Sequence, residues 1–230
     1  GGSAIPSGII NFASDHRIEI TGIYGFTDGL AAGIGTSDIA DDFGARNADA
    51  VNSITPLVFT EFDTEGENKE LKFRSPWIPD GYFNAESEKA YRDGWFYPGD
   101  SAEITEDGKI RIRDRIKDLI KSGGEFIPSA LLEYYISNIG DVGDVAVIGV
   151  KDEKWVERPV AFYRTRTGKP LDEEVIRSYL RDLASKGSIK EWWIPDRFIF
   201  MNSMPMTGTG KIDKKTLREF AGKVQENNNI

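Results

Sequence analysis

The spacing of apolar residues changes near the middle of the chain, and this change constrains the fold more than any other feature. In Lys109–Arg113, basic residues alternate with isoleucine, which is typical of a strand with one face in the core. In Leu131–Ile136, apolar residues instead recur at helical spacing. A charged segment, residues 114–118, lies between the two patterns. The sequence therefore predicts two domains, residues 1–113 and residues 114–230.

The first predicted domain is rich in strand signals. Glycine, asparagine and aspartate interrupt its β-branched and aromatic runs and mark turns between strands. The predicted strands are residues 18–25, 56–63, 71–75, 95–97, 102–104 and 109–113. Residues 31–53 are small and polar with little periodicity, so we interpret them as a loop. The basic residues of the last strand leave a nucleic-acid-binding ribbon as an alternative to a half-buried strand.

The second predicted domain mixes helices and strands. Pro128 is expected at the start of a helix, because proline is tolerated in a first helical turn. Asp172 and Asp213 are expected to cap two further helices through their carboxylates. The predicted strands are residues 144–150, 158–164 and 197–201. Together the two domains indicate the α+β fold class.

The composition argues against several classes of function. The formal net charge is −9, whereas a nucleic-acid partner or an anionic membrane surface requires a basic face. No apolar run approaches the length of about 20 residues that spans a bilayer. The chain has no cysteine, which excludes disulfides and thiolate metal sites, and a cytoplasmic location is the default expectation.

His16 is the only histidine, and it precedes the first predicted strand in a polar stretch. We expect it to face solvent. Without a second histidine, imidazole triads and histidine-rich metal sites are nearly excluded. Any chemistry must therefore depend on positioning, cations and carboxylates.

Two segments combine charge with glycine, Asp114–Glu125 and Pro205–Lys211. The second ends in Gly-Thr-Gly-Lys but is not a Walker phosphate loop, because Ile212 follows the lysine where serine or threonine is required. An exposed surface loop is the simpler interpretation of this segment taken alone. Together, however, the two segments resemble the closing motifs of the adenylate-forming enzymes, which include acyl-CoA synthetases, firefly luciferases and peptide-synthetase adenylation domains.

The resemblance covers almost the whole chain and is strongest over residues 74–218. Residues 155–159 and 190–196 look most like medium- and long-chain fatty-acyl-CoA synthetases. The resemblance implies that the first domain is the β-rich end of the large adenylation domain, including its small β-barrel subdomain. It implies that the second is a compact α+β C-terminal lid domain, which rotates about a hinge near Lys117.

In this family the lysine of the closing motif reaches the reacting carboxylate and phosphate, and Lys211 stands at that position. The physics suits such a lysine, because a carboxylate that attacks the α-phosphate of ATP brings two anions together. One ammonium about 4 Å away is worth about 4 kcal/mol per unit charge at an effective dielectric near 20. The attacking carboxylate is already ionised, so no histidine base is required. The resemblance therefore implies that Lys211 is catalytic.

The resemblance also implies a nucleotide site. Tyr24, Gly25 and Thr27 match a segment in which the tyrosine lies against adenine and the threonine meets phosphate. Asp100 matches an aspartate that accepts hydrogen bonds from the ribose hydroxyls of ATP, and Arg115 matches a second contact to ribose or phosphate. A turn aspartate and a surface arginine are the simpler alternatives for these two residues taken singly.

A metal ligand and an acceptor loop complete the implied site. Asp28 stands where the family has a glutamate that helps to hold Mg²⁺, and its carboxylate is one methylene shorter. Ser122, Gly123 and Gly124 match the loop that closes on the pantetheine arm of CoA, and a plain hairpin turn is the alternative. Glycine suits such a loop, because backbone without a Cβ can approach a thin ligand closely. Val156 departs from the family pattern, in which glycine is common at this position.

The implied parent enzyme is an ATP-dependent acyl-CoA synthetase that converts a carboxylic acid, expected to be a fatty acid, into acyl-AMP and then acyl-CoA. Its substrates are the acid, ATP and CoA, and Mg²⁺ is its cofactor. The chain lacks the family's upstream phosphate loop, so we expect it to be inactive alone. Within the family, an aryl-acid or amino-acid adenylation domain is the alternative. A non-catalytic binding module that reuses the lid domain is the alternative outside it, and a homodimer is left open.

Overall fold

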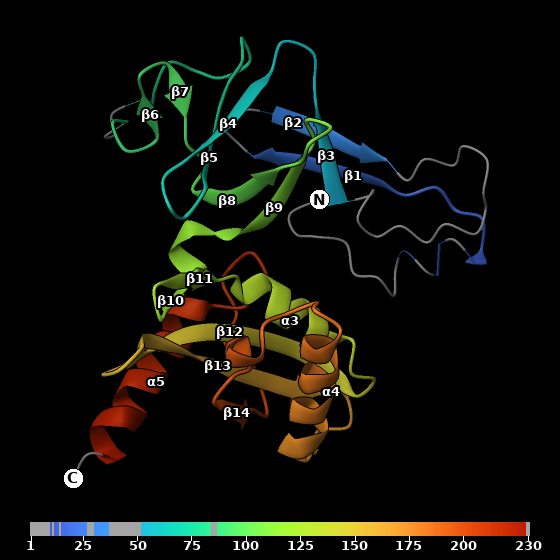
Figure 1. Cartoon of the computed structure of the whole chain (residues 1–230), viewed down its shortest axis with the longest axis vertical. Coiled ribbons are helices and arrows are strands. Elements are labelled where there is room, and N and C mark those ends of the chain that lie inside the picture. The colour runs from blue at the N-terminus through green and yellow to red at the C-terminus, as the bar shows by residue number, and fades with distance from the viewer. Residues whose placement is uncertain are drawn as a thin grey trace. The chain divides into compact units, whose positions relative to one another are not determined.

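The structure is a computed structural model that describes residues 10, 12–13, 15–26, 30–36, 52–83 and 87–228. The chain divides into two compact units, Gly1–Lys117 and Asp118–Ile230 (Figure 1). Each unit has its own sheet and its own apolar core. The α+β class predicted from the sequence is confirmed. Among the described residues, no helix is both long enough and apolar enough to cross a membrane.

A nine-stranded sheet forms the first unit. Its strands are β1 (Thr21–Phe26), β2 (Leu30–Thr36), β3 (Ser53–Pro56), β4 (Glu61–Glu65), β5 (Glu70–Arg74), β6 (Tyr91–Arg92), β7 (Trp95–Phe96), β8 (Asp100–Ile104) and β9 (Ile110–Arg115). Their order is β1-β2-β3-β9-β8-β5-β7-β6, with β4 paired to β5. The two end strands β1 and β6 do not pair, so the described strands form an open sheet instead of the closed barrel that the resemblance implied.

Aromatic rings hold the first unit together. Phe73 and Phe96 are buried, and their ring centroids lie 5.4 Å apart in an edge-to-face arrangement. Phe26 on β1 packs against both, at 4.7 Å from the Phe73 ring and 5.2 Å from the Phe96 ring. Such ring pairs stabilise a core beyond the area that they bury. The sheet therefore coils enough to bring β1 against β5 and β7, which are not its neighbours in the strand order.

The loop predicted for residues 31–53 is wrong over its first part, because residues 31–36 belong to β2. Residues 37–51 lie outside the described residues. The absence of a side chain explains part of the difference: a Cβ on Gly33 would lie 2.2 Å from the side chain of Ile54 on β3. Gly33, a residue type that is typical of a loop, is here required by the close approach of two strands.

The strand predicted for residues 56–63 is also wrong, because a turn separates β3 from β4. The backbone N–H of Thr60 donates to the carbonyl of Leu57 at 3.1 Å. Phe59 has a φ of 63°, which a strand does not permit. The remaining predicted strands of this unit overlap β1, β5, β7, β8 and β9.

In the second unit, a five-stranded sheet lies between helices. The elements are η1 (Ile116–Asp118), which spans the division between the units, β10 (Ile120–Ser122), β11 (Glu125–Ile127), α3 (Ser129–Ser137), β12 (Val142–Asp152), β13 (Val156–Thr165), α4 (Glu173–Ser185), η2 (Glu191–Trp193), β14 (Arg197–Phe200) and α5 (Lys214–Asn228). The strand order is β11-β10-β13-β12, and β14 pairs in parallel with β13.

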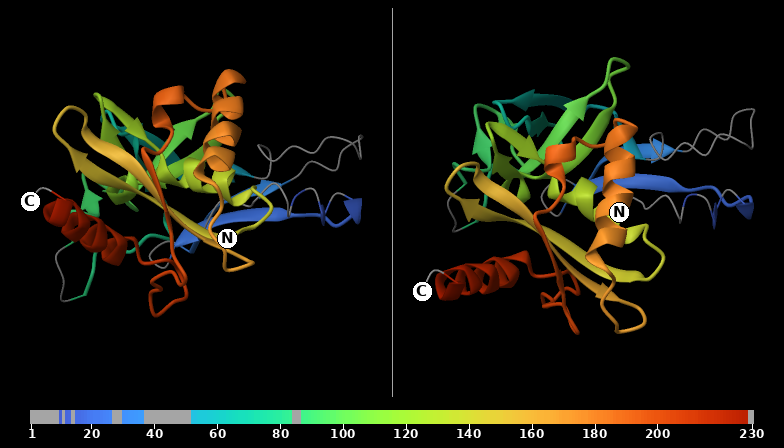
Figure 2. Two further views of the ribbon diagram at one scale, coloured as in Figure 1. Left: turned by 90° about the horizontal axis from the view of Figure 1, so that it is seen from below. Right: turned by 60° about the horizontal axis from the view of Figure 1, so that its bottom comes forward.

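Helices cover both faces of the β12–β13 sheet, as Figure 2 shows. Val145 and Val147 face one core, which contains apolar residues of α3 and α4. Ala146 and Ile148 face the other core, which contains Leu217 of α5. Because successive side chains of a strand point to opposite faces, burial on both sides explains the continuous apolar run in β12.

The predicted helix starts in the second unit are confirmed. Pro128 occupies the N-cap of α3. The Asp172 carboxylate accepts the backbone N–H of Glu174 at 3.0 Å, and the Asp213 carboxylate accepts that of Lys215 at 3.0 Å. The three predicted strands correspond to β12, β13 and β14.

Candidate functional site

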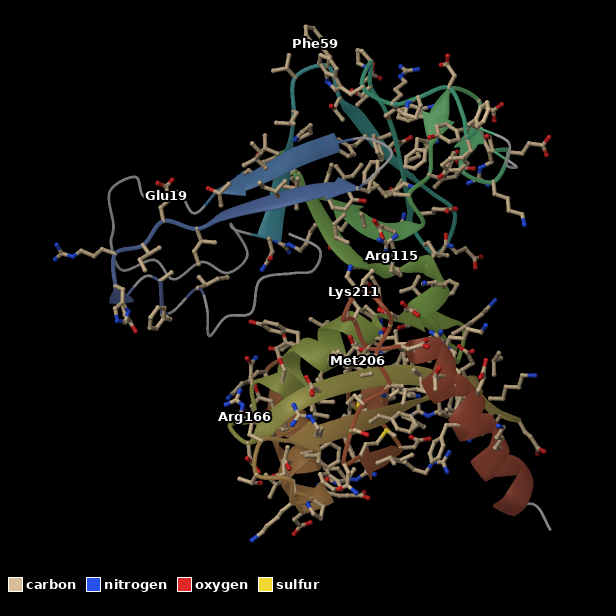
Figure 3. The ribbon with its side chains drawn as sticks, turned by 180° about the vertical axis from the view of Figure 1, so that it is seen from behind. Glu19, Phe59, Arg115, Arg166, Met206 and Lys211 are labelled. Carbon is tan, nitrogen blue, oxygen red and sulfur yellow. The ribbon has the colours of Figure 1, made fainter. Side chains whose placement is uncertain are left out.

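Tyr24, Asp100 and Arg115 meet in the first unit, where Arg115 is labelled in Figure 3. The Tyr24 hydroxyl donates to Asp100 Oδ2 at 2.6 Å. Arg115 Nε lies 2.9 Å from Asp100 Oδ1. Asp100 and Arg115 are partners across the β8–β9 pairing, and Tyr24 comes from β1. The structure thus brings together three of the five residues predicted for the nucleotide site.

Asp100 is a buried carboxylate, with 5% of its surface exposed. Burial raises its pKa above the ordinary value, while the Tyr24 hydrogen bond and the Arg115 guanidinium oppose the rise and the Asp114 carboxylate adds to it. Burial also raises the pKa of the Tyr24 hydroxyl, so this group stays a donor. Arg115 in turn donates from Nη1 to the carbonyl of Pro98 at 3.1 Å, which fixes the plane of its guanidinium.

The Asp100 carboxylate has acceptor capacity to spare. An ionised carboxylate offers about four lone-pair positions, and Tyr24 and Arg115 use one on each oxygen. Each oxygen can therefore accept one further hydrogen bond. The vicinal hydroxyls of a ribose supply two donors with this spacing, so the residues present fit the sugar of a nucleotide.

Of the other residues predicted around the nucleotide, the structure describes only Gly25. Gly25 lies on β1, where the register with β2 shifts between Tyr24 and Gly25. Thr27 and Asp28 lie outside the described residues, so their roles at phosphate and Mg²⁺ stay predictions. Among the residues that the structure does describe, no group of three or more His, Cys, Asp or Glu side chains could hold a metal ion.

Lys211 lies in the second unit, on the connection between β14 and α5 (Figure 3). A tight turn precedes it, in which the N–H of Thr207 donates to the carbonyl of Lys211 at 2.7 Å and the N–H of Gly210 to the carbonyl of Thr207 at 2.9 Å. The lysine is exposed, and its ammonium has no hydrogen bond or ion pair with any described residue. The backbone is therefore fixed while the charge stays available to a ligand.

Ser122, Gly123 and Gly124 form the turn between β10 and β11. Gly123 and Gly124 have φ angles of 58° and 85°, in the left-handed region that favours glycine. A Cβ on Gly123 would lie 3.0 Å from the Trp155 ring, whereas nothing lies within 4 Å of a Cβ on Gly124. The turn is thus packed at its first glycine and open at its second.

Lys117 is an exposed residue of η1 and the last residue of the first unit. Asp118, the first residue of the second unit, accepts a hydrogen bond from Arg218 of α5 at 2.5 Å. The division of the chain thus falls beside the lysine that the resemblance implied as a hinge, and rotation about it stays a prediction.

Two simpler expectations concern single residues. His16 is exposed as expected, and its ring stacks on Phe12 with centroids 4.0 Å apart. Of the three basic residues that suggested a nucleic-acid-binding ribbon, Arg113 pairs with Glu103 at 2.8 Å and Lys109 with Asp107 at 3.1 Å. These acidic partners neutralise two of the three charges.

The turn Ser122–Gly124 is called the acceptor turn below, because the resemblance implied that it meets CoA. Arg158 lies beside it and was not assigned a role from the sequence. Arg158 donates from Nη1 to Ser122 Oγ at 3.3 Å and pairs with Asp196, with Nη2 at 2.7 Å from Oδ1. The sequence did contain a clue to this pair. Arg158 lies in the run 155–159 and Asp196 in the run 190–196, and these two runs carried the resemblance to fatty-acyl-CoA synthetases.

Residues 132–211 match the family model of the AMP-binding enzyme C-terminal domain. The chain is 40% identical over 150 residues to 3-methylmercaptopropionyl-CoA ligase of Ruegeria pomeroyi, covering 65% of this chain and 27% of the relative. It is 31% identical over 240 residues to medium-chain-fatty-acid–CoA ligase of Ectopseudomonas oleovorans, covering 97% of this chain and 43% of the relative. The chain therefore spans less than half the length of these curated relatives.

Two solved structures have a similar fold. One is o-succinylbenzoate CoA synthetase from Bacillus subtilis in complex with its acyl-adenylate intermediate, with a TM-score of 0.81 and 23% identity over 95% of this chain and 45% of that one. The other is the amide bond synthetase McbA from Marinactinospora thermotolerans, with a TM-score of 0.79 and 24% identity over 96% of this chain and 45% of that one. Residues 132–211 thus match the C-terminal domain of AMP-binding enzymes, and the relatives to which the chain is similar are acyl-CoA ligases.

Proposed function

We propose that this chain supplies part of an ATP-dependent acyl-CoA ligase, which activates a carboxylic acid as acyl-AMP and transfers the acyl group to CoA. The observation that carries the proposal is the exposed ammonium of Lys211, which has no partner among the described residues and stands on a backbone fixed by a tight turn. The similarity to a 3-methylmercaptopropionyl-CoA ligase and to a medium-chain-fatty-acid–CoA ligase supports an enzyme that joins an acid to a thiol. The proposed acid is a fatty acid. In this proposal residues 1–113 end the large domain and residues 114–230 form the mobile lid.

In the first half-reaction, Asp100 accepts hydrogen bonds from the ribose hydroxyls with the capacity left by Tyr24 and Arg115. The ion pair with Arg115 opposes the rise in pKa that burial causes and orients this carboxylate. In this proposal Tyr24 lies against the adenine beside Gly25, Thr27 would meet the phosphates, and Asp28 would help to hold Mg²⁺, which would screen the phosphate charge. These residues bind and orient the nucleotide.

Lys211 places a positive charge beside the reacting carboxylate and α-phosphate. The substrate carboxylate attacks the α-phosphate and pyrophosphate leaves, so an ammonium beside the reacting oxygens lowers the barrier. Loss of a comparable preorganised donor typically costs about 10²- to 10³-fold in rate. The second half-reaction needs no such cation, because the thiol attacks an uncharged acyl carbonyl.

Transfer to CoA uses the other loop of the second unit. At Gly124 the acceptor turn exposes backbone that no side chain covers. Such backbone can lie close to the thin pantetheine arm of CoA. Rotation about Lys117 would let the same unit present Lys211 first and the turn second. Such a hinge motion assigns one domain to two steps.

The test uses a chimera in which residues 1–230 replace the matching part of the Ectopseudomonas oleovorans ligase. Lys211→Ala is expected to slow acyl-AMP formation by about 10²- to 10³-fold and to spare thioester formation from supplied acyl-AMP. Lys223→Ala, a change at an exposed lysine of α5, is the matched control and should leave both half-reactions intact.

Equal loss of both half-reactions in Lys211→Ala would remove the catalytic assignment. A chimera that binds CoA or acid but never consumes ATP would favour a binding module instead. Faster turnover of aryl or amino acids than of fatty acids would favour the alternative adenylation domains. The isolated chain is expected to show no ligase activity.

A further inference from the structure

The guanidinium of Arg158 uses all its donors on one side of the second unit. Nε donates to the two carboxylate oxygens of Asp196 at 3.2 and 3.0 Å, and Nη2 donates to Oδ1 at 2.7 Å. Nη1 donates to Ser122 Oγ at 3.3 Å and to the carbonyl of Trp192 at 2.9 Å. Nη2 also donates to the carbonyl of Ile194 at 3.4 Å. One side chain thus joins the acceptor turn to the segment 192–196.

Only an arginine can make this set of contacts. Its five N–H groups form a planar fork, which spans several acceptors in fixed directions, whereas a lysine offers three donors from a single nitrogen. The side chain of Arg158 is 14% exposed, so water competes little for its donors. The buried Ser122 hydroxyl and the Asp196 carboxylate lie on opposite arms of the fork.

Apart from the β10–β11 hairpin that it closes, the acceptor turn has little other support from the sheet. Its strand β10 pairs with β13 at a single position, Ser122 with Val156. Beyond that pair, the N–H of Gly123 donates to the carbonyl of Trp155 at 3.1 Å, and the N–H of Lys121 donates to Glu157 Oε2 at 2.8 Å. The side chains of Arg158 and Glu157 and the carbonyl of Trp155 therefore tie this hairpin to β13, with which β10 pairs at one position only.

We propose that Arg158 is a positioning residue that fixes the shape of the Ser122–Gly124 turn for the thiol acceptor, with Asp196 as its anchor. This inference rests on the proposed function for the identity of the acceptor. It also gives a physical reason why the runs 155–159 and 190–196 occur together: they are the two sides of one brace.

The structural arm of the test uses the chain as it is. Arg158→Lys keeps the charge and removes the fork. Amide hydrogen exchange at Lys121 and Gly123 is expected to accelerate at least about tenfold, the factor that corresponds to 1.4 kcal/mol at 25 °C. The matched control is Arg164→Lys, which breaks the fork of another arginine of β13 that pairs with Asp144 at 2.6 Å, about 20 Å further along the strand.

The functional arm uses the chimera described above. Arg158→Lys is expected to raise the KM for CoA about tenfold, the factor of 1.4 kcal/mol, while the rate of acyl-AMP formation changes less than about twofold. A purely structural role would lower both half-reactions together. Asp196→Asn keeps the shape of the anchor and removes its charge, so it should shift exchange and KM in the same direction by a smaller factor. It also serves if Arg158→Lys does not fold.

Unchanged exchange at residues 121–123 in both variants would overturn the brace itself. Faster exchange with an unchanged KM for CoA would overturn the role toward the acceptor. If the wild-type chimera makes no acyl-AMP and no thioester, the proposed function fails, and the exchange rates alone then support or overturn the brace. The same exchange pattern in Arg164→Lys would also overturn it.

Discussion

Asp100 shows how one buried residue can serve structure and chemistry together. Its carboxylate is 5% exposed, yet both oxygens have partners, Tyr24 and Arg115. A buried charge is costly unless it is paired and hydrogen-bonded, and both conditions are met here. The remaining acceptor positions are the part that the proposed function uses.

Because the pKa of Asp100 is raised, the free energy of unfolding should fall as pH rises. The folded state holds the proton more tightly than the unfolded state, so this residue's contribution is full below the ordinary pKa, about 3.9, and is lost as pH rises through the folded pKa. Between these values, wild type is expected to lose stability relative to Asp100→Asn as pH rises. Urea unfolding followed by circular dichroism from about pH 2 to pH 7 measures the difference.

Asp107→Asn is the matched control within the first unit. The pKa of Asp107 is lowered, first by a hydrogen bond from Thr105 and then by Lys109, so its contribution is present above the ordinary pKa and lost as pH falls. The two variants should therefore differ from wild type with slopes of opposite sign, Asp107→Asn below the ordinary pKa and Asp100→Asn above it. A slope of the same sign for both would contradict the role assigned to burial at Asp100.

Among the elements, the β12–β13 hairpin combines a regular ladder with a strained end. Ten residue pairs connect its strands, and helices cover both faces. At its tip Val156 has a φ of 75°, which is unfavourable for a β-branched residue. Glycine, which the resemblance implied to be common at this position, would adopt this conformation without the strain.

Val156→Gly is expected to stabilise the second unit by up to about 1 kcal/mol. Relief of the left-handed conformation is worth about 1–2 kcal/mol, and the extra freedom of glycine in the unfolded chain offsets about 0.5–1 kcal/mol. The side chain is 59% exposed, so little apolar burial is lost. The change in free energy of unfolding in urea measures this.

Val175→Gly provides the contrast. Val175 is 51% exposed in α4, where its φ is not positive, so glycine there should lower stability through its poor helix propensity. Destabilisation of similar size at both positions would show that Val156 is not strained.

At the scale of the whole molecule, the two units are separate in their cores. The clusters around Leu132 and around Ala146 lie entirely within residues 118–230, and those around Ile54 and Phe73 lie entirely within the first unit. A unit with its own core on both faces of a sheet can fold independently. This separation is also what a domain needs if it is to rotate about a hinge.

Residues 118–230 expressed alone are expected to unfold in one cooperative transition, with a midpoint in urea close to that of the same unit in the full chain. Circular dichroism at increasing urea, compared with tryptophan fluorescence, measures the coincidence of secondary and tertiary unfolding. A gradual transition, or two probes that disagree, would show that the second unit depends on the first.

The local sequence pattern predicted most helices and strands of the second unit, but fewer strands of the first. The helix starts at Pro128, Asp172 and Asp213 follow from the chemistry of the residues at those positions, and the structure confirms them. The strand β2 escaped prediction because its small residues are favourable only beside β3, where Gly33 meets Ile54. The open strand order likewise depends on contacts that no local pattern specifies.

The sequence by itself determined the period of each element, the helix caps, the chemical types available to the site and the family motifs. Only the tertiary structure decided which of those residues touch. Tyr24 and Asp100 are 76 positions apart, and Arg158 and Asp196 are 38 apart. Local propensity acts over a few residues, whereas such pairs form only after the sheet order and the packing of its faces have brought distant segments together.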